Sequence, residues 1–117
     1  MRQTICFTLP LLPGTTDIDR DEMRACWQGD RAEAHRASRA RHGIIREATW
    51  IQPTPMGDVA IVLLESGDLA ASLFGMATSP HPFDGWFRAH VKSVHGIDLA
   101  DGMQLPEMIL EYQRAHQ

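Results

Sequence analysis

The 117-residue sequence predicts an α+β fold in which helices cover one antiparallel, four-stranded sheet. Three observations carry this prediction. Four stretches of the chain have the pattern of strands, apolar residues recur at helical spacing after the first and third of them, and glycine or proline marks the boundaries. The resulting order, β-α-β-β-α-β, is satisfied most simply by a two-layer sandwich of helices on a sheet.

The N-terminal part predicts one strand and one long helix. Residues 3–9 alternate between apolar and polar side chains, which is typical of a strand that is buried on at least one face. Acidic residues crowd the start of residues 17–41 and basic residues crowd their end. This charge order suits the dipole of a single helix, which Gly43 would terminate.

The middle of the chain predicts a hairpin. Residues 44–52 alternate, whereas residues 59–64 are apolar on both faces, as expected of a central strand. The proline-containing segment 53–58 would form the loop between them.

The C-terminal part predicts two helical segments and a last strand. Residues 68–77 are rich in Ala, Leu and Met, and a second helix is predicted from Pro82 to His95 because Pro suits a first helical turn and Gly96 a helix end. Residues 107–112 alternate again and are predicted to complete the sheet. No repeat or second domain is indicated, so residues 1–117 are expected to form one domain.

Composition excludes some classes of function. The formal net charge of −4 argues against a general binder of nucleic acid or of anionic membranes. No apolar segment is long enough to span a bilayer, and the apolar stretch near the N-terminus lacks a cleavage signal, so a cytoplasmic location is expected. Cys6 and Cys26 lack metal or redox spacing and are expected to be free, buried thiols.

A basic group at the end of the first predicted helix is the first candidate site. Arginine forks can hold a carboxylate or a phosphate there. The alternative is a solvated helix end whose bases complement the dipole. The group comprises Arg31, His35, Arg36, Arg39, Arg41, His42 and Arg46.

The six histidines are a second source of chemistry. Their spacing matches no metal-binding motif, so no metal or other cofactor is predicted. A single histidine can still act as a general base because it titrates near neutral pH, and His42 and His90 are the candidates.

Two aromatic segments are candidates for the wall of a pocket. Trp50 and Gln52 offer a ring and an amide next to the proline-rich loop, although a strand end with Trp50 on a sheet face or a dimer interface explains them equally well. Trp86 lies off the apolar stripe that Phe83 and Phe87 form, and it can face a cleft.

Three segments together resemble a family of small uncharacterised bacterial proteins within the dimeric α/β-barrel superfamily of ferredoxin-like domains. They are Trp50 to Asp58, Pro82 to Phe87 and His95 to Leu99. The resemblance implies a ferredoxin-like βαββαβ domain and a homodimer. Cofactor-free monooxygenases of that superfamily rely on an active-site asparagine together with tryptophan, and this chain contains no asparagine.

The function expected from the sequence is that of a cytoplasmic homodimer that binds a small anionic or aromatic metabolite between sheet and helices. Its expected ligand-binding residues are Trp50, Gln52, Trp86, Arg39 and Arg46. One alternative is a cofactor-free enzyme resembling a monooxygenase or an isomerase, with His42 or His90 as its base. A further alternative is a structural dimer that binds no ligand.

Overall fold

A computed structural model describes residues 1–114 of the chain. The described part is α+β, as predicted, with a three-stranded sheet, four α-helices and one short 3-10 helix. In chain order the elements are β1 (Gln3–Pro10), α1 (Thr16–Gln28), α2 (Ala32–Arg41), β2 (Ile44–Thr54), β3 (Gly57–Ser66), α3 (Leu69–Thr78), α4 (Pro82–His95) and η1 (Leu99–Asp101).

The sheet is antiparallel and has the order β1-β3-β2, so the apolar third strand is central, as predicted. β2 and β3 form a hairpin that is longer than expected, because the strands continue to Thr54 and resume at Gly57. The Thr54 hydroxyl donates to the Gly57 carbonyl and accepts from the Met56 amide, which closes a tight turn. Gly57 has φ +116°, a conformation that glycine adopts at no steric cost.

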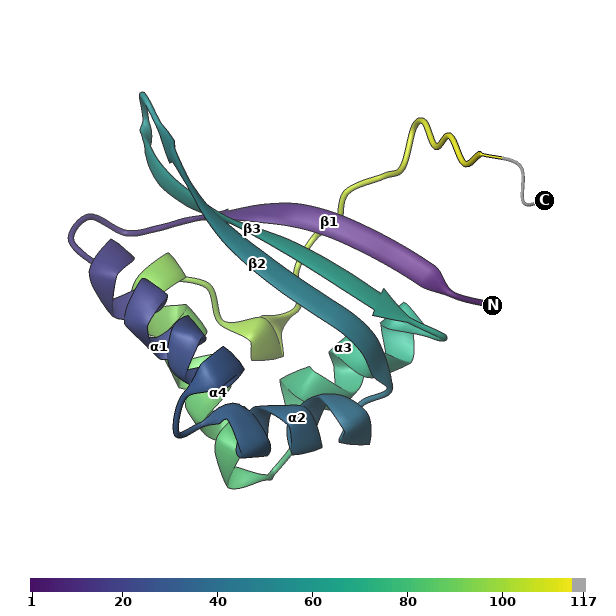
Figure 1. Cartoon of the computed structure of the whole chain (residues 1–117), viewed down its shortest axis with the longest axis horizontal. Helices are drawn as coiled ribbons and strands as arrows, with labels where there is room; N and C mark the ends of the chain where they lie inside the picture. The colour runs from purple at the N-terminus through teal and green to yellow at the C-terminus, as the bar shows by residue number, and fades with distance from the viewer. Residues whose placement is uncertain (115–117) are drawn as a thin grey trace.

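All four helices lie on one side of the sheet (Figure 1). Along β1, Phe7 and Leu9 face these helices, so Cys6 between them points to the opposite face. In the described chain no helix or strand covers that opposite face. This explains why Cys6 is exposed, against the prediction of a buried thiol, while Cys26 on α1 is buried as predicted.

The predicted long helix over residues 17–41 is wrong: the chain forms two helices, α1 and α2, separated at Gly29. Gly29 is extended, with φ −116° and ψ −155°, and the amides of both Gly29 and Arg31 donate to the Ala25 carbonyl. A Cβ at position 29 would lie 2.7 Å from the Ala25 Cα. The chain therefore turns where only glycine fits.

The predicted fourth strand over residues 107–112 does not form in the described chain. After η1 the chain leaves the helices and runs past the sheet, without regular structure up to residue 114 (Figure 1). Its large apolar residues have no layer to pack against. Met108, Ile109, Leu110 and Tyr112 are between 59% and 88% exposed.

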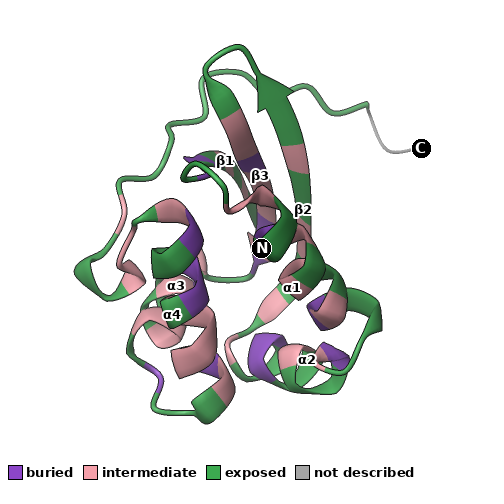
Figure 2. Cartoon of the chain, turned by 90° about the vertical axis from the view of Figure 1, so that its left-hand side faces the viewer, coloured by how far each residue is buried: buried purple, intermediate pink, exposed green. Residues whose placement is uncertain are grey.

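The helices and the sheet pack around few fully buried residues (Figure 2). The accessible surface of the chain is 8024 Å², whereas a compact monomer of this mass would expose about 6400 Å². The chain is thus open, with a hollow between its two layers.

No helix of residues 1–114 is both long and apolar enough to cross a membrane.

Candidate functional site

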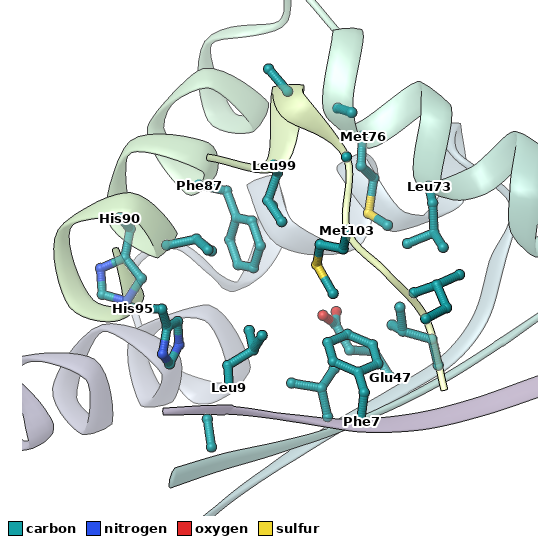
Figure 3. Close-up of a pocket in the computed structure, with 18 of the residues that line it drawn as sticks. Phe7, Leu9, Glu47, Leu73, Met76, Phe87, His90, His95, Leu99 and Met103 are labelled. Carbon is teal, nitrogen blue, oxygen red and sulfur yellow. The ribbon is translucent and has the colours of Figure 1, made fainter. Parts of the chain in front are cut away.

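A cavity of about 450 Å³ lies between the inner face of the sheet and the helices (Figure 3). Most of its wall is apolar. β1 and β3 contribute alternate residues such as Phe7, Leu9 and Val62, because every second side chain of a strand points to the same face. Across from them lie Leu73, Met76 and Phe87 of α3 and α4 and Leu99 and Met103 of the chain after α4.

A buried acid–histidine pair joins α1 and α4 at this cavity. The Nε2 atom of His90 lies 2.8 Å from Oδ1 of Asp19, and both residues line the cavity. Asp19 is only 2% exposed. Its other oxygen, Oδ2, has no hydrogen-bond partner within residues 1–114. An unpaired buried oxygen on a carboxylate is costly, and this oxygen is shielded from solvent as well as unpaired.

A second acidic side chain enters the cavity from the sheet. The carboxylate of Glu47 on β2 points toward the helices (Figure 3) and accepts from Arg39 Nε at 2.8 Å and from Arg39 Nη2 at 3.2 Å. His35 Nε2 lies 2.7 Å from the same carboxylate. Burial would raise the pKa of Glu47, but the hydrogen bond from His35 and the charge of Arg39 outweigh it and lower that pKa to about 2. The carboxylate of Glu47 is therefore hydrogen-bonded within the fold and paired with the charge of Arg39.

A groove of about 840 Å³ continues from the cavity along the free edge of β2. The two hollows share Asp19, Met23, Glu47, Thr49 and Phe87. Asp19 therefore stands where they meet.

A third buried acid lies outside both hollows and holds α2 against α4. Asp84 accepts from Ser38, from Arg41 at 3.1 Å and from the ring of His42 at 2.8 Å. Burial would raise the pKa of Asp84, but the hydrogen bonds led by that of Ser38 hold it well below its usual range. Gly75 on α3 allows the close approach of His42, because a Cβ there would lie 2.7 Å from its ring.

The residues expected from the sequence to form the site divide into three groups. Arg39 and His90 line the cavity, whereas Arg46 and Trp50 line the groove along β2. The remaining three line neither hollow: His42 is held by Asp84, Gln52 donates to the Pro53 carbonyl at 3.1 Å, and Trp86 stacks on His90. The guanidinium of Arg31 also lies over Trp86, 3.8 Å from the centroid of its ring.

Sequence reasoning missed Asp19 and Glu47, two of the three acids that line the cavity. For both residues the sequence itself indicates an acid on an inward face. Asp19 precedes Met23 and Cys26 at helical spacing, so it lies on the apolar stripe of α1. Glu47 shares the inward face of β2 with Thr49 and Ile51. An acid on a face that is otherwise buried needs either a partner or a ligand.

Comparisons with known proteins give no identity to this site. No protein-family model matches the chain, and no curated protein of similar sequence was found. Within residues 1–114 no group of three His, Cys, Asp or Glu residues is placed to hold a metal ion. The function must therefore be argued from the cavity itself.

Proposed function

We propose that this protein binds a small, largely apolar molecule in the cavity between its sheet and its helices. The observation that carries the proposal is an apolar cavity of about 450 Å³, a volume in the range of small-molecule sites. The expected metabolite is aromatic or aliphatic rather than anionic, because both nitrogens of Arg39 that face the cavity acid are already bound to Glu47.

Titration with the neutral apolar dye N-phenyl-1-naphthylamine tests this proposal. We expect saturable fluorescence enhancement with one dye bound per chain. Val62→Trp places an indole in the cavity and should weaken binding at least tenfold, whereas Ile18→Trp on the exposed face of α1 should leave it unchanged. Equal binding by wild type and Val62→Trp, with both folded by circular dichroism, would reject the cavity as the site.

The Asp19–His90 pair favours a second candidate function, a cofactor-free enzyme of the isomerase type. Asp19 holds one ring nitrogen of His90, which leaves the other nitrogen to take a proton from a carbon next to a carbonyl. In a β,γ-unsaturated ketone the C–H electron pair would delocalise as a dienolate. The γ-carbon would take the proton back, so the double bond moves into conjugation and no co-reactant is needed.

Exchange of the α-protons of 4-phenyl-2-butanone in D2O, followed by NMR, separates this enzyme from a binding protein. Deuterium incorporation above the buffer rate that is lost in His90→Gln supports the enzyme. The same rate in buffer, wild type and His90→Gln counts against it. His42→Gln serves as the matched control, because the ring of His42 is bound to Asp84 away from the cavity.

We further propose that the chain is a ferredoxin-like domain and forms a cytoplasmic homodimer through the uncovered face of its sheet. That face is apolar at its centre: Cys6, Leu63 and Ala48 are neighbours across the sheet, and Ile61 pairs with Trp50 in the next row. The chain exposes about 1600 Å² more than a compact monomer of its mass. Part of this area belongs to residues 107–114, which are all exposed, and a stable dimer buries about 800 Å² on each partner.

Light scattering coupled to size-exclusion chromatography tests the dimer. We expect twice the mass of one chain at micromolar concentration and a monomer for Ile61→Lys, whose charge would lie in the interface. Ala34→Lys, an exposed change on α2, should remain dimeric. A wild-type monomer at 100 µM would refute the dimer and leave the cavity proposal intact.

A further inference from the structure

The groove along β2 is basic, although the chain as a whole is acidic. The net charge of the chain is −4, yet four of its eleven lysines and arginines line this groove. Two of them, Arg24 on α1 and Arg36 on α2, are exposed and make no ion pair within residues 1–114. The two acids of the groove, Asp19 and Glu47, already have basic partners. The helix side of the groove therefore offers positive charge to an acidic occupant.

The groove also exposes an edge of the sheet. Six consecutive residues of β2, from Arg46 to Ile51, line it, so both faces of the strand and its backbone border the groove. β2 pairs only with β3, and no other backbone hydrogen bond reaches residues 46–51 in the part of the chain that the structure describes. The N–H and C=O groups on such a free edge bind another strand. The groove thus suits an extended, acidic segment of polypeptide.

The C-terminal tail, residues 107–112, is a segment of this kind. Its residues alternate as those of a strand do, include no proline and are all exposed. In an extended segment Glu107 and Glu111 lie on one face, about 13 Å apart, and neither makes an ion pair among the described residues. The tail is as long as the segment of β2 that lines the groove. The other face of the tail carries Met108, Leu110 and Tyr112.

The tail does not fill the groove of its own chain. It lies apart from α1 (Figure 1), and no residue of the tail lines the groove. The other free edge of the sheet, that of β1, fits the tail less well. Residues Gln3–Pro10 carry no charged side chain to pair with Glu107 or Glu111, and Pro10 has no N–H to donate. The groove of a second copy therefore offers the tail more than the β1 edge does.

We propose that the tail of one chain adds as a strand to the free edge of β2 in a second copy. The glutamate face of the tail turns toward Arg24 and Arg36 of that copy, and its apolar face extends the open face of the sheet beside Ala48 and Trp50. This inference rests on the proposed homodimer, whose open sheet faces meet, and it names the segment that crosses between the copies. Reciprocal exchange gives each sheet a fourth strand and closes the assembly at two chains.

Two charge-reversed variants of the full chain test this exchange. In one, Glu107→Arg and Glu111→Arg make the tail basic, and in the other, Arg24→Glu and Arg36→Glu make the groove acidic. Each variant alone places like charges in both contacts of a dimer, so its self-association in sedimentation at 50 mM NaCl should weaken at least tenfold. Mixed together, the two variants should form a one-to-one dimer with a dissociation constant within threefold of the wild type, because both contacts again join opposite charges.

Asp30→Arg combined with Glu33→Arg is the matched control, because both residues are exposed and lie outside the groove. It changes the net charge as much as the tail variant does and should dimerise like the wild type. Reversed variants that dimerise like the wild type, or a mixture that stays monomeric, would overturn the inference and leave the homodimer in place. A wild-type monomer at 100 µM would overturn both.

The wild type decides if a reversed variant fails to fold by circular dichroism. Salt screens attraction between exposed charges, so the dissociation constant of the wild-type dimer should rise at least threefold between 50 mM and 500 mM NaCl. A constant that does not rise would overturn the inference.

Discussion

Asp19 and Asp84 are buried and Glu47 is largely buried, and the partners of each indicate what it does. Glu47 and Asp84 accept several hydrogen bonds from arginine, histidine and serine, so their charges are compensated within the fold. Asp19 has one compensated oxygen and one unpaired oxygen. Removing one partner of any of these buried carboxylates should therefore reduce stability.

The low pKa of Glu47 predicts a loss of stability in acid. Its pKa is about 2 in the folded chain against an ordinary value of 4.5. A lowered pKa means that the stabilisation is complete above about pH 4.5 and disappears as the pH falls toward 2. The shift corresponds to about 3 kcal/mol of unfolding free energy. Urea unfolding of the wild type between pH 7 and pH 2 should show this decline.

Glu47→Gln should remove the part of that pH dependence that Glu47 contributes and leave the part that comes from Asp84. It should lower the unfolding free energy at pH 7 by about 3 kcal/mol, because Arg39 is left buried without its acidic partner. Glu107→Gln, an exposed change of the same kind, should alter neither. A Glu47→Gln variant as stable as the wild type at pH 7 would show that the ion pair contributes nothing net.

At the scale of elements, the sequence predicted most of the helices and strands but not what interrupts or completes them. β1, β3 and α4 follow from periodicity and from glycine and proline at their ends. The break at Gly29 was missed because the charges of residues 17–41 fit one helix as well as two. The prediction of the last strand was wrong for a different reason. Alternation shows that a segment is able to pair, but a strand forms only beside another strand, and the pattern does not say where that neighbour is.

The candidate site was harder to predict than the fold. His90 and Arg39 were expected and do line the cavity, but their partners Asp19 and Glu47 are 71 and 8 residues away along the chain. Such contacts depend on how α1, α4 and β2 come together. Spacing along one element reports only neighbours on that element, so it could not pair His90 with Asp19.

The break between α1 and α2 gives a prediction at this scale. Gly29→Ala would place a Cβ 2.7 Å from the Ala25 Cα, so the backbone must shift. We expect a loss of about 1–3 kcal/mol of unfolding free energy in urea, as for other overpacked sites. At Gly67, by contrast, the nearest atom to a new Cβ lies 3.9 Å away. Gly67→Ala should therefore be close to neutral, and equal effects of the two changes would contradict the steric argument.

The C-terminal segment gives a second prediction for an element. Its exposed apolar residues, Met108, Ile109, Leu110 and Tyr112, would pack on the partner in the proposed dimer. A chain that ends at Pro106 keeps Met103 and Leu105 at the cavity. It should retain the wild-type circular dichroism and dissociate at least tenfold more readily in sedimentation. Unchanged dissociation would show that residues 107–117 take no part in the dimer.

At the scale of the molecule, the four helices share one face of the sheet and leave the other open (Figure 1). This arrangement separates two tasks. The covered face encloses the cavity, and the open face is apolar at its centre, where Cys6, Leu63 and Ala48 are neighbours. A ligand and a second copy of the chain would thus approach opposite sides of the same sheet, and each can be tested without disturbing the other.

The two cysteines report on these two sides. Cys6 is exposed on the open face, so alkylation should be fast in the monomer. Cys26 is buried, and burial raises the pKa of its thiol to about 11, so little reactive thiolate forms at pH 8. Iodoacetamide followed by mass spectrometry should therefore modify Cys6 first. As the protein concentration rises through the dissociation constant of the dimer, the rate of alkylation at Cys6 should fall at least tenfold, while alkylation of Cys26 stays slow throughout.

Cys26→Ser isolates the signal of Cys6, and denaturation should make both thiols react. If the rate at Cys6 stays constant over a range in which light scattering records dimer formation, the dimer must use a surface other than the open face of the sheet.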